Sequence, residues 1–168
     1  YFVSSKWSYN KRDNHHVNDP YVHGDSLFIS MFSFSGNWLN EVYDGGVLEI
    51  DLVKEEIVGP VITDKWMPHS ITRVDGKLTL LDSMAGKLWH GSYGMLGKFS
   101  GFVRGLDHDG KYYYIATTEH RYPEKLNGIS TNISLDTGFY VFDSETKMSK
   151  FYSMDNIESI HSILVIKQ

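Results

Sequence analysis

The chain has 168 residues, which is enough for one domain with a hydrophobic core. Its net charge of −5 argues against a nucleic-acid binder, which would present a basic surface to phosphates, and no run approaches the roughly 18 apolar residues of a membrane-spanning helix. The chain contains no cysteine, which excludes disulfides and thiolate metal sites, and no signal peptide is visible; both features fit a cytoplasmic protein.

The first third of the chain predicts short strands separated by turns. Residues 1–5 have the composition of the middle of a strand, so we expect an N-terminal portion to be missing from this sequence. The strand that follows His16 should be short or bulged at Pro20, because proline cannot donate to a ladder. Residues 26–31 predict the next strand. Residues 32–45 form a long aromatic connection, of the kind that packs over a cavity or meets a partner.

A repeated pattern organises the rest of the chain. In residues 68–87, a strand of alternating apolar residues ends in a tight Asp-Gly-Lys turn, and a second short strand follows. Similar units appear on both sides of this stretch, and the last of them is incomplete. The units begin at His16, His69, Arg104 and His161.

The second half of the unit repeats as well. Gly46 opens a strand of alternating residues that ends in Asp51, and Gly138 opens a similar strand that ends in Asp143. In both places a polar turn and another strand follow. Each unit therefore predicts four antiparallel strands.

Repeating four-stranded units without helical periodicity predict an all-β fold of the β-propeller type. We expect a single domain, 1–168, that forms a partial propeller of about three blades and a closing strand and that could be a fragment of a larger propeller. Because propellers usually have 4 to 8 blades, the ring would close through missing upstream blades, which we favour, or through oligomerisation. A β-sandwich or an open meander is the alternative. The predicted units are 16–68, 69–103, 104–160 and the closing strand 161–168.

Several segments resemble a largely uncharacterised group of bacterial β-propeller-like proteins. They are HVND, MPHSITRVDGKLTLLDSMAGKL, SGFVRGLDHDGKYYYIATTEHR and GFYVFD, and the resemblance extends from His16 to about Val165. The chain departs from the signature of that group at Ile71-Thr72, at residues 82–84 and at Ser100-Gly101. The resemblance implies a propeller fold and little about activity.

The first residues of the four units are the candidate site. In a propeller these positions converge on one end of the central channel, which we call the channel mouth. Imidazoles of His16, His69 and His161 could hold a divalent metal there. Arg104 would repel a cation and suits a carboxylate or phosphate instead. The remaining candidates, which could orient the imidazoles and line the ligand site, are Asn18, Asp19 and Ser70.

Two classes of function follow from this interpretation. The first is a binding or scaffold module whose channel mouth holds a small anionic ligand or a protein partner. The second is a lyase-like enzyme, with or without a metal, in which His16 or His69 is the general base and Arg104 is the carboxylate clamp. Of the other histidines, His120 is expected to be solvated, on a long loop that could overhang the channel.

Overall fold

The computed structural model describes residues 13–120, 122–125 and 132–166. Within these ranges the chain forms twelve β-strands and two short 3-10 turns, η1 (Trp38–Asn40) and η2 (Pro123–Lys125), and no α-helix. The predicted all-β class is therefore confirmed. The strand predicted at residues 1–5 lies outside the described residues.

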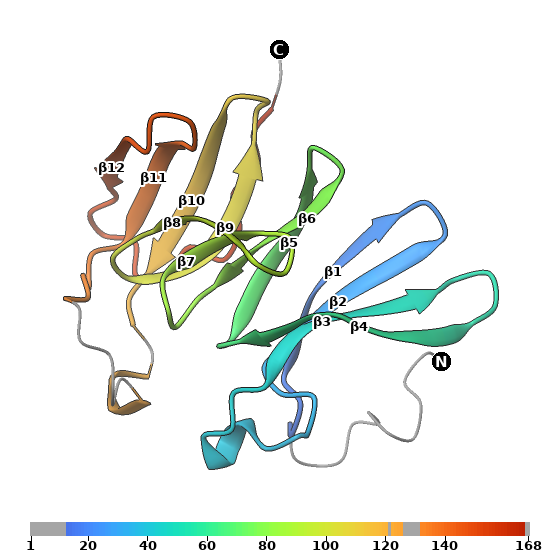
Figure 1. Cartoon of the computed structure of the whole chain (residues 1–168). Helices are drawn as coiled ribbons and strands as arrows, with labels where there is room; N and C mark the ends of the chain where they lie inside the picture. The colour runs from blue at the N-terminus through green and yellow to red at the C-terminus, as the bar shows by residue number, and fades with distance from the viewer. Residues whose placement is uncertain (1–12, 121, 126–131, 167–168) are drawn as a thin grey trace.

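The strands form three four-stranded antiparallel sheets, each built from four strands that follow one another in the sequence. The sheets lie side by side like propeller blades (Figure 1), as the repeat predicts. Blade 1 contains β1 (Val17–His23), β2 (Ser26–Met31), β3 (Gly45–Asp51) and β4 (Glu56–Lys65). Blade 2 contains β5 (Pro68–Val74), β6 (Lys77–Asp82), β7 (Lys87–His90) and β8 (Gly94–Lys98). Blade 3 contains β9 (Phe102–His108), β10 (Tyr112–Thr118), β11 (Gly138–Asp143) and β12 (Ser149–Ser153).

Tight turns join the first two strands of each blade. In blade 2, Asp75 and Gly76 both have positive φ angles, 47° and 77°, and the pairing of Val74 with Lys77 closes a two-residue hairpin. In blade 3, the carboxylate of Asp109 accepts hydrogen bonds from the main-chain N–H groups of Tyr112 and Lys111. These bonds lower the pKa of Asp109 to about 2.

The glycine that opens the third strand has a steric cause. A Cβ atom on Gly46 would lie 1.9 Å from the carbonyl oxygen of Ile62 on β4. A Cβ atom on Gly138 would lie 2.2 Å from the carbonyl oxygen of Tyr152 on β12. In blades 1 and 3 the third strand thus approaches the fourth too closely for a side chain near its start, which explains why glycine recurs there in these two units.

The hydrophobic core lies in the seams where one blade packs against the next. Alternating residues of each strand point to the two faces of its sheet, so every blade supplies one apolar set to each seam. The seam between blades 1 and 2 contains Phe28, Val47, Ile62, Ile71 and Leu80. The seam between blades 2 and 3 contains Val74, Leu81, Leu88, Phe99, Val103, Leu106, Tyr113, Ile115 and Phe142.

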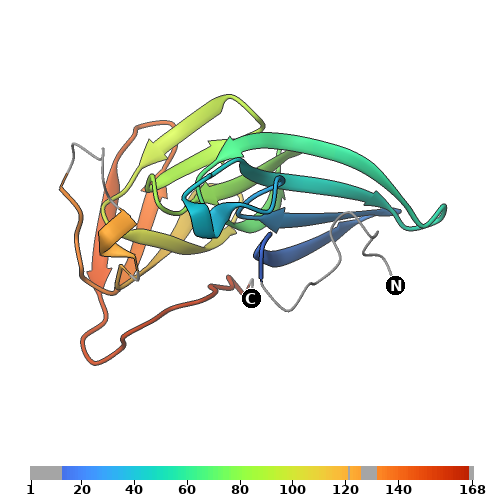
Figure 2. The same ribbon diagram turned by 90° about the horizontal axis from the view of Figure 1, so that it is seen from below.

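The first strands of the blades lie next to one another along the inside of the assembly, with β5 in contact with both β1 and β9. After β12 the chain runs back from the outer edge of blade 3 as an extended segment (Figure 2). The predicted closing strand falls in this segment, but residues 154–166 join no sheet ladder. They reach β9 instead, where the N–H of Val165 donates to Asp107 Oδ2 at 2.6 Å.

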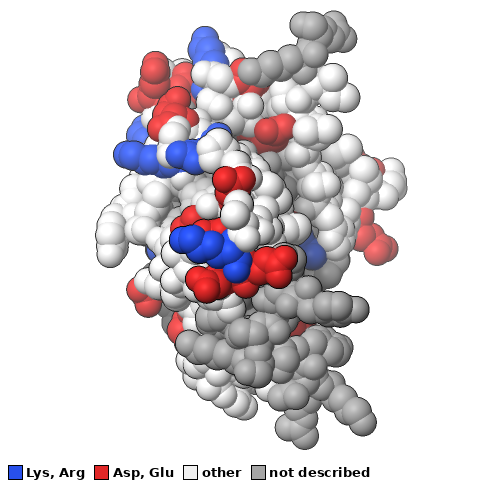
Figure 3. All heavy atoms as spheres, turned by 90° about the vertical axis from the view of Figure 1, so that its right-hand side faces the viewer, with Lys and Arg blue, Asp and Glu red and all other residues white. Residues whose placement is uncertain are grey.

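Charged side chains of both signs are interspersed on the face seen in Figure 3. In the turn between β3 and β4, Lys54 Nζ lies 3.5 Å from Asp51 Oδ2. In the part of the chain that the structure describes, no helix has the length and apolar character needed to cross a membrane.

Candidate functional site

Each inner strand carries a β-bulge at the end where the predicted site lies. One extra residue is accommodated between Val17 and Pro20 in β1, and another between His69 and Thr72 in β5. In β9 the extra residue is Arg104, because the flanking residues of this strand pair with consecutive residues of β10. A bulge turns a side chain away from the regular alternation, and bulges occur often beside functional sites. The three bulges therefore determine the direction in which side chains at this end of the inner strands point.

His69 is the buried centre of the site, with only 3% of its surface exposed. Its Nδ1 lies 2.8 Å from Ser83 Oγ and 3.0 Å from the carbonyl oxygen of Met67, which fixes the ring. Phe32 and Phe102 pack against the imidazole in edge-on geometry. Burial lowers the pKa of His69 to about 3, so the ring is neutral at neutral pH.

The other unit-starting residues surround this imidazole. The charge of Arg104 is the second cause of the lowered His69 pKa, and the charges of His16 and His161 add to it. Four positions that are far apart in the sequence therefore lie within electrostatic reach of one another. Among them, His69 is buried, His16 and Arg104 are half-buried, and His161 is exposed.

His16 is held by a carboxylate that the sequence pattern did not single out. Its main-chain N–H donates to Asp13 Oδ1 at 2.9 Å, and its Nδ1 contacts Asp13 Oδ2. The ring lies against Phe32 and Trp38, with centroid distances of 4.2 and 4.9 Å. The backbone of His16 is left-handed, with φ of 46°, which is uncommon for a residue with a side chain. Asp13 thus orients the imidazole and leaves Nε2 as the nitrogen that a ligand could reach.

Three candidate residues take part in hydrogen bonds with main-chain groups and not with the imidazoles that they were expected to orient: Asn18, Asp19 and Ser70. The N–H of Ser70 donates to Asp19 Oδ2 at 2.9 Å, and the Ser70 hydroxyl donates to the carbonyl oxygen of Arg104. Asn18 Nδ2 donates to the carbonyl oxygen of His16 at 3.3 Å. Asp19 and Ser70 thus join the inner strands of neighbouring blades, and Asn18 bonds within its own unit, whereas Asp13 and Ser83 contact the imidazole nitrogens of His16 and His69.

The long aromatic loop between β2 and β3 packs over this site. Phe32 and Trp38 contact His16, and Trp38 also meets Tyr122 of the loop after β10 at a centroid distance of 6.3 Å. Lys125 Nζ lies 3.7 Å from Glu41 Oε1 and joins the same two loops. The loop therefore packs over His16 and against the loop after β10.

His120 differs from the sequence expectation. It is 5% exposed rather than solvated and packs edge-on against Phe102. The N–H of Tyr122 donates to its Nδ1 at 3.2 Å, and burial lowers its pKa. In the described part of the chain its Nε2 has no hydrogen-bond partner. The sequence carried little signal of this burial, because His120 follows an exposed Glu119 outside the alternating pattern.

The described residues contain no group of three His, Asp or Glu side chains placed so that they could hold a metal ion. His16, His69 and His161, the predicted metal ligands, thus do not form such a group in the described part of the chain. The contacts of His69 with Ser83 and Met67, and of His16 with Asp13, occupy the Nδ1 atom of each ring.

Comparison with solved structures places the fold among known propellers. The chain is similar to the acylaminoacyl peptidase of Pyrococcus horikoshii in its orthorhombic crystal form, a β-propeller peptidase, with a TM-score of 0.52 and 14% sequence identity. The match covers 84% of this chain and 25% of the peptidase chain, so this chain spans about a quarter of that protein. At this identity the likeness shows the fold alone.

Comparison with the curated proteins by sequence gives no match. A family model, described as a domain of unknown function, matches residues 12–168. The match includes all three blades and the C-terminal segment that contacts β9. The chain therefore belongs to the DUF4915 family.

Proposed function

We propose that this chain is a propeller-type binding module whose channel mouth holds a small anionic ligand, a carboxylate or a phosphate. The observation that carries the proposal is the electrostatic coupling of Arg104, His16 and His161 to the buried His69. Residues from four repeat units would thus contribute to one ligand site. Small-molecule sites in proteins combine apolar walls with a few polar groups that converge on the ligand.

The surroundings of Arg104 support an anion. A guanidinium presents a planar fork of donors that matches carboxylate and phosphate oxygens. His69 beside it is neutral, so Arg104 is the fixed positive charge of this group at neutral pH. The aromatic rings of Phe32 and Trp38 next to His16 would supply the apolar wall.

The geometry gives less support to an enzyme with His69 as general base. A catalytic base works best when its pKa lies near the working pH, whereas the pKa of His69 is lowered to about 3. Only the pair of Asp13 and His16 resembles an oriented base. Catalysis therefore remains the second candidate, with His16 rather than His69 as its base.

The proposal is tested by titrating the purified chain with inorganic phosphate, succinate and glucuronate in a calorimeter. Glucose is the uncharged match for glucuronate. We expect at least one anion to bind while glucose does not, and we expect Arg104→Gln to weaken that binding at least tenfold. Arg73→Gln is the matched control, because Arg73 lies at the opposite end of β5, where its Nε donates to Gly76.

Binding that Arg104→Gln leaves unchanged would overturn the proposal, as would equal binding of glucose or no binding of any anion. Circular dichroism of each variant separates a lost ligand contact from a lost fold. A His16→Gln variant tests the second candidate: if a turnover is found with any bound acid, this substitution should abolish it while binding persists.

A further inference from the structure

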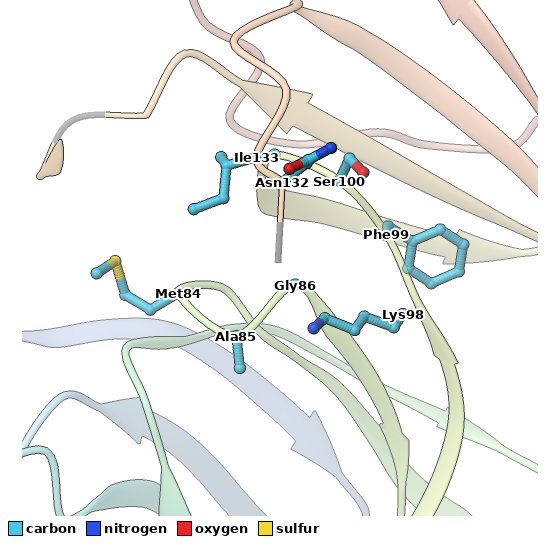
Figure 4. Close-up of a pocket in the computed structure, with 9 residues that line it drawn as sticks. Met84, Ala85, Gly86, Lys98, Phe99, Ser100, Asn132 and Ile133 are labelled. Carbon is cyan, nitrogen blue, oxygen red and sulfur yellow. The ribbon is translucent and has the colours of Figure 1, made fainter. Parts of the chain in front are cut away.

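A cavity of about 200 Å³ opens between blades 2 and 3. Its walls come from the β6–β7 turn, the end of β8 with the connection to β9, and the segment that precedes β11 (Figure 4). None of the residues that line it is one of the candidate residues of the channel mouth. The residues that define its chemistry are Met84, Ala85, Lys98, Ser100, Asn132 and Ile133.

The cavity presents both apolar and polar groups. In Figure 4, Met84 and Lys98 lie below the gap, where the Lys98 side chain extends toward Gly86, and Ile133 lies above it. Asn132 and Ser100 lie together at the upper edge. An ammonium, an amide and a hydroxyl match an anionic head group, and the thioether and aliphatic carbons match a short hydrocarbon chain.

We propose that this cavity binds a small monocarboxylate with a short aliphatic chain, with its carboxylate at Lys98 and its chain against Met84 and Ile133. The size agrees with this class, because a cavity of about 200 Å³ holds several water molecules and so has room for the few non-hydrogen atoms of a short-chain carboxylate. The proposal does not rest on the function proposed for the channel mouth.

The test uses the whole chain with 13C-methyl-labelled methionine and sodium butyrate as the probe. Butyrate should shift the Met84 methyl resonance in a saturable way, and Met84→Leu serves only to assign that signal. Butanol and butylamine have the same chain with a neutral and a positive head group. Both are expected to bind at least tenfold more weakly than butyrate.

Three variants make the outcome decisive. Lys98→Met should weaken butyrate binding at least tenfold, and Ala85→Leu should weaken it by filling space without changing charge. Lys111→Met is the control, because Lys111 is exposed in the β9–β10 turn. Equal affinity for butanol, a shift that does not saturate, or full binding by Lys98→Met would each overturn the proposal. Arg104→Gln should leave butyrate binding in the cavity unchanged, so the proposal for the cavity and the proposal for the channel mouth are tested by different variants.

Discussion

The main-chain N–H of Ser70 donates to Oδ2 of Asp19 at 2.9 Å, so a carboxylate of one blade binds the inner strand of the next. Asp107 makes the corresponding contact with Val165 at 2.6 Å. Each aspartate lies three residues after the start of its unit, at His16 or Arg104. A repeated carboxylate bond thus connects β1 to β5 and β9 to the C-terminal segment.

Removing the first of these carboxylates should destabilise the fold. In Asp19→Ala the half-buried N–H of Ser70 loses its acceptor, which typically costs about 1–3 kcal/mol. The free energy of unfolding, measured by urea denaturation, should fall by this amount. Asp25→Ala is the control, since Asp25 is exposed in the β1–β2 turn and should change stability by less than about 0.5 kcal/mol. Equal effects of the two substitutions would contradict a role for the carboxylate bond.

Removing the second carboxylate should loosen one segment and spare the rest. In Asp107→Ala the N–H of Val165 loses its acceptor, and we expect faster hydrogen exchange in residues 160–166. Exchange in the strands of blades 1 and 2 should be unchanged. Asp155→Ala provides the comparison, because Asp155 bonds to Ser153 in the same segment but not to β9. Unchanged exchange at 160–166 would show that other contacts hold this segment.

The glycines that open the third strands give a third prediction. Gly138→Ala places a Cβ 2.2 Å from a main-chain oxygen of β12, so the strands must shift, and we expect a loss of about 1–3 kcal/mol. Gly97→Ala is the matched substitution in β8, where the added carbon meets only ring atoms of Phe142 and Phe99 at 3.0 Å. Its loss in thermal denaturation should be smaller, and the reverse order would refute the steric explanation.

The features that the sequence predicted are those with a local cause. The turn at Asp75-Gly76 and the alternating strands follow from backbone preferences and from the two faces of a sheet. Gly46 and Gly138 recur at the same place in the repeat, and the structure adds the steric reason for them. The grouping of His16, His69, Arg104 and His161 followed in turn from the repeat, because equivalent residues of stacked blades lie at the same end.

Features that depend on contacts between units were not predictable in this way. The partnership of Asp13 with His16 and the burial of His120 depend on how two long loops fold over the mouth. The bulge beside Pro20 in β1 agrees with the sequence expectation, because proline cannot donate to a ladder. Alternation alone does not indicate the bulges in β5 and β9, which change the direction of a side chain. The cavity beside Gly101 arises only when two blades pack, so a single strand pattern carries no sign of it.

His69 and Asp82 should give the stability opposite dependences on pH. The pKa of His69 falls from 6.5 to about 3 on folding, so the unfolded chain binds an extra proton between these values and stability decreases as the pH is lowered through them. Burial raises the pKa of Asp82 from 3.8 to about 6, so the folded chain binds the extra proton there and stability decreases as the pH rises from 3.8 to 6.

The His69→Gln variant isolates the first of these effects. Since one pH unit within the window corresponds to about 1.4 kcal/mol, the stability difference between wild type and variant should be about 2 kcal/mol larger near pH 7.5 than near pH 5.0. Urea denaturation at both pH values measures it. For Asp82→Asn the corresponding difference should change in the opposite direction. A His69→Gln difference that is the same at both pH values would mean that the imidazole takes up a proton equally in the folded and unfolded chains, which its burial between Phe32 and Phe102 argues against.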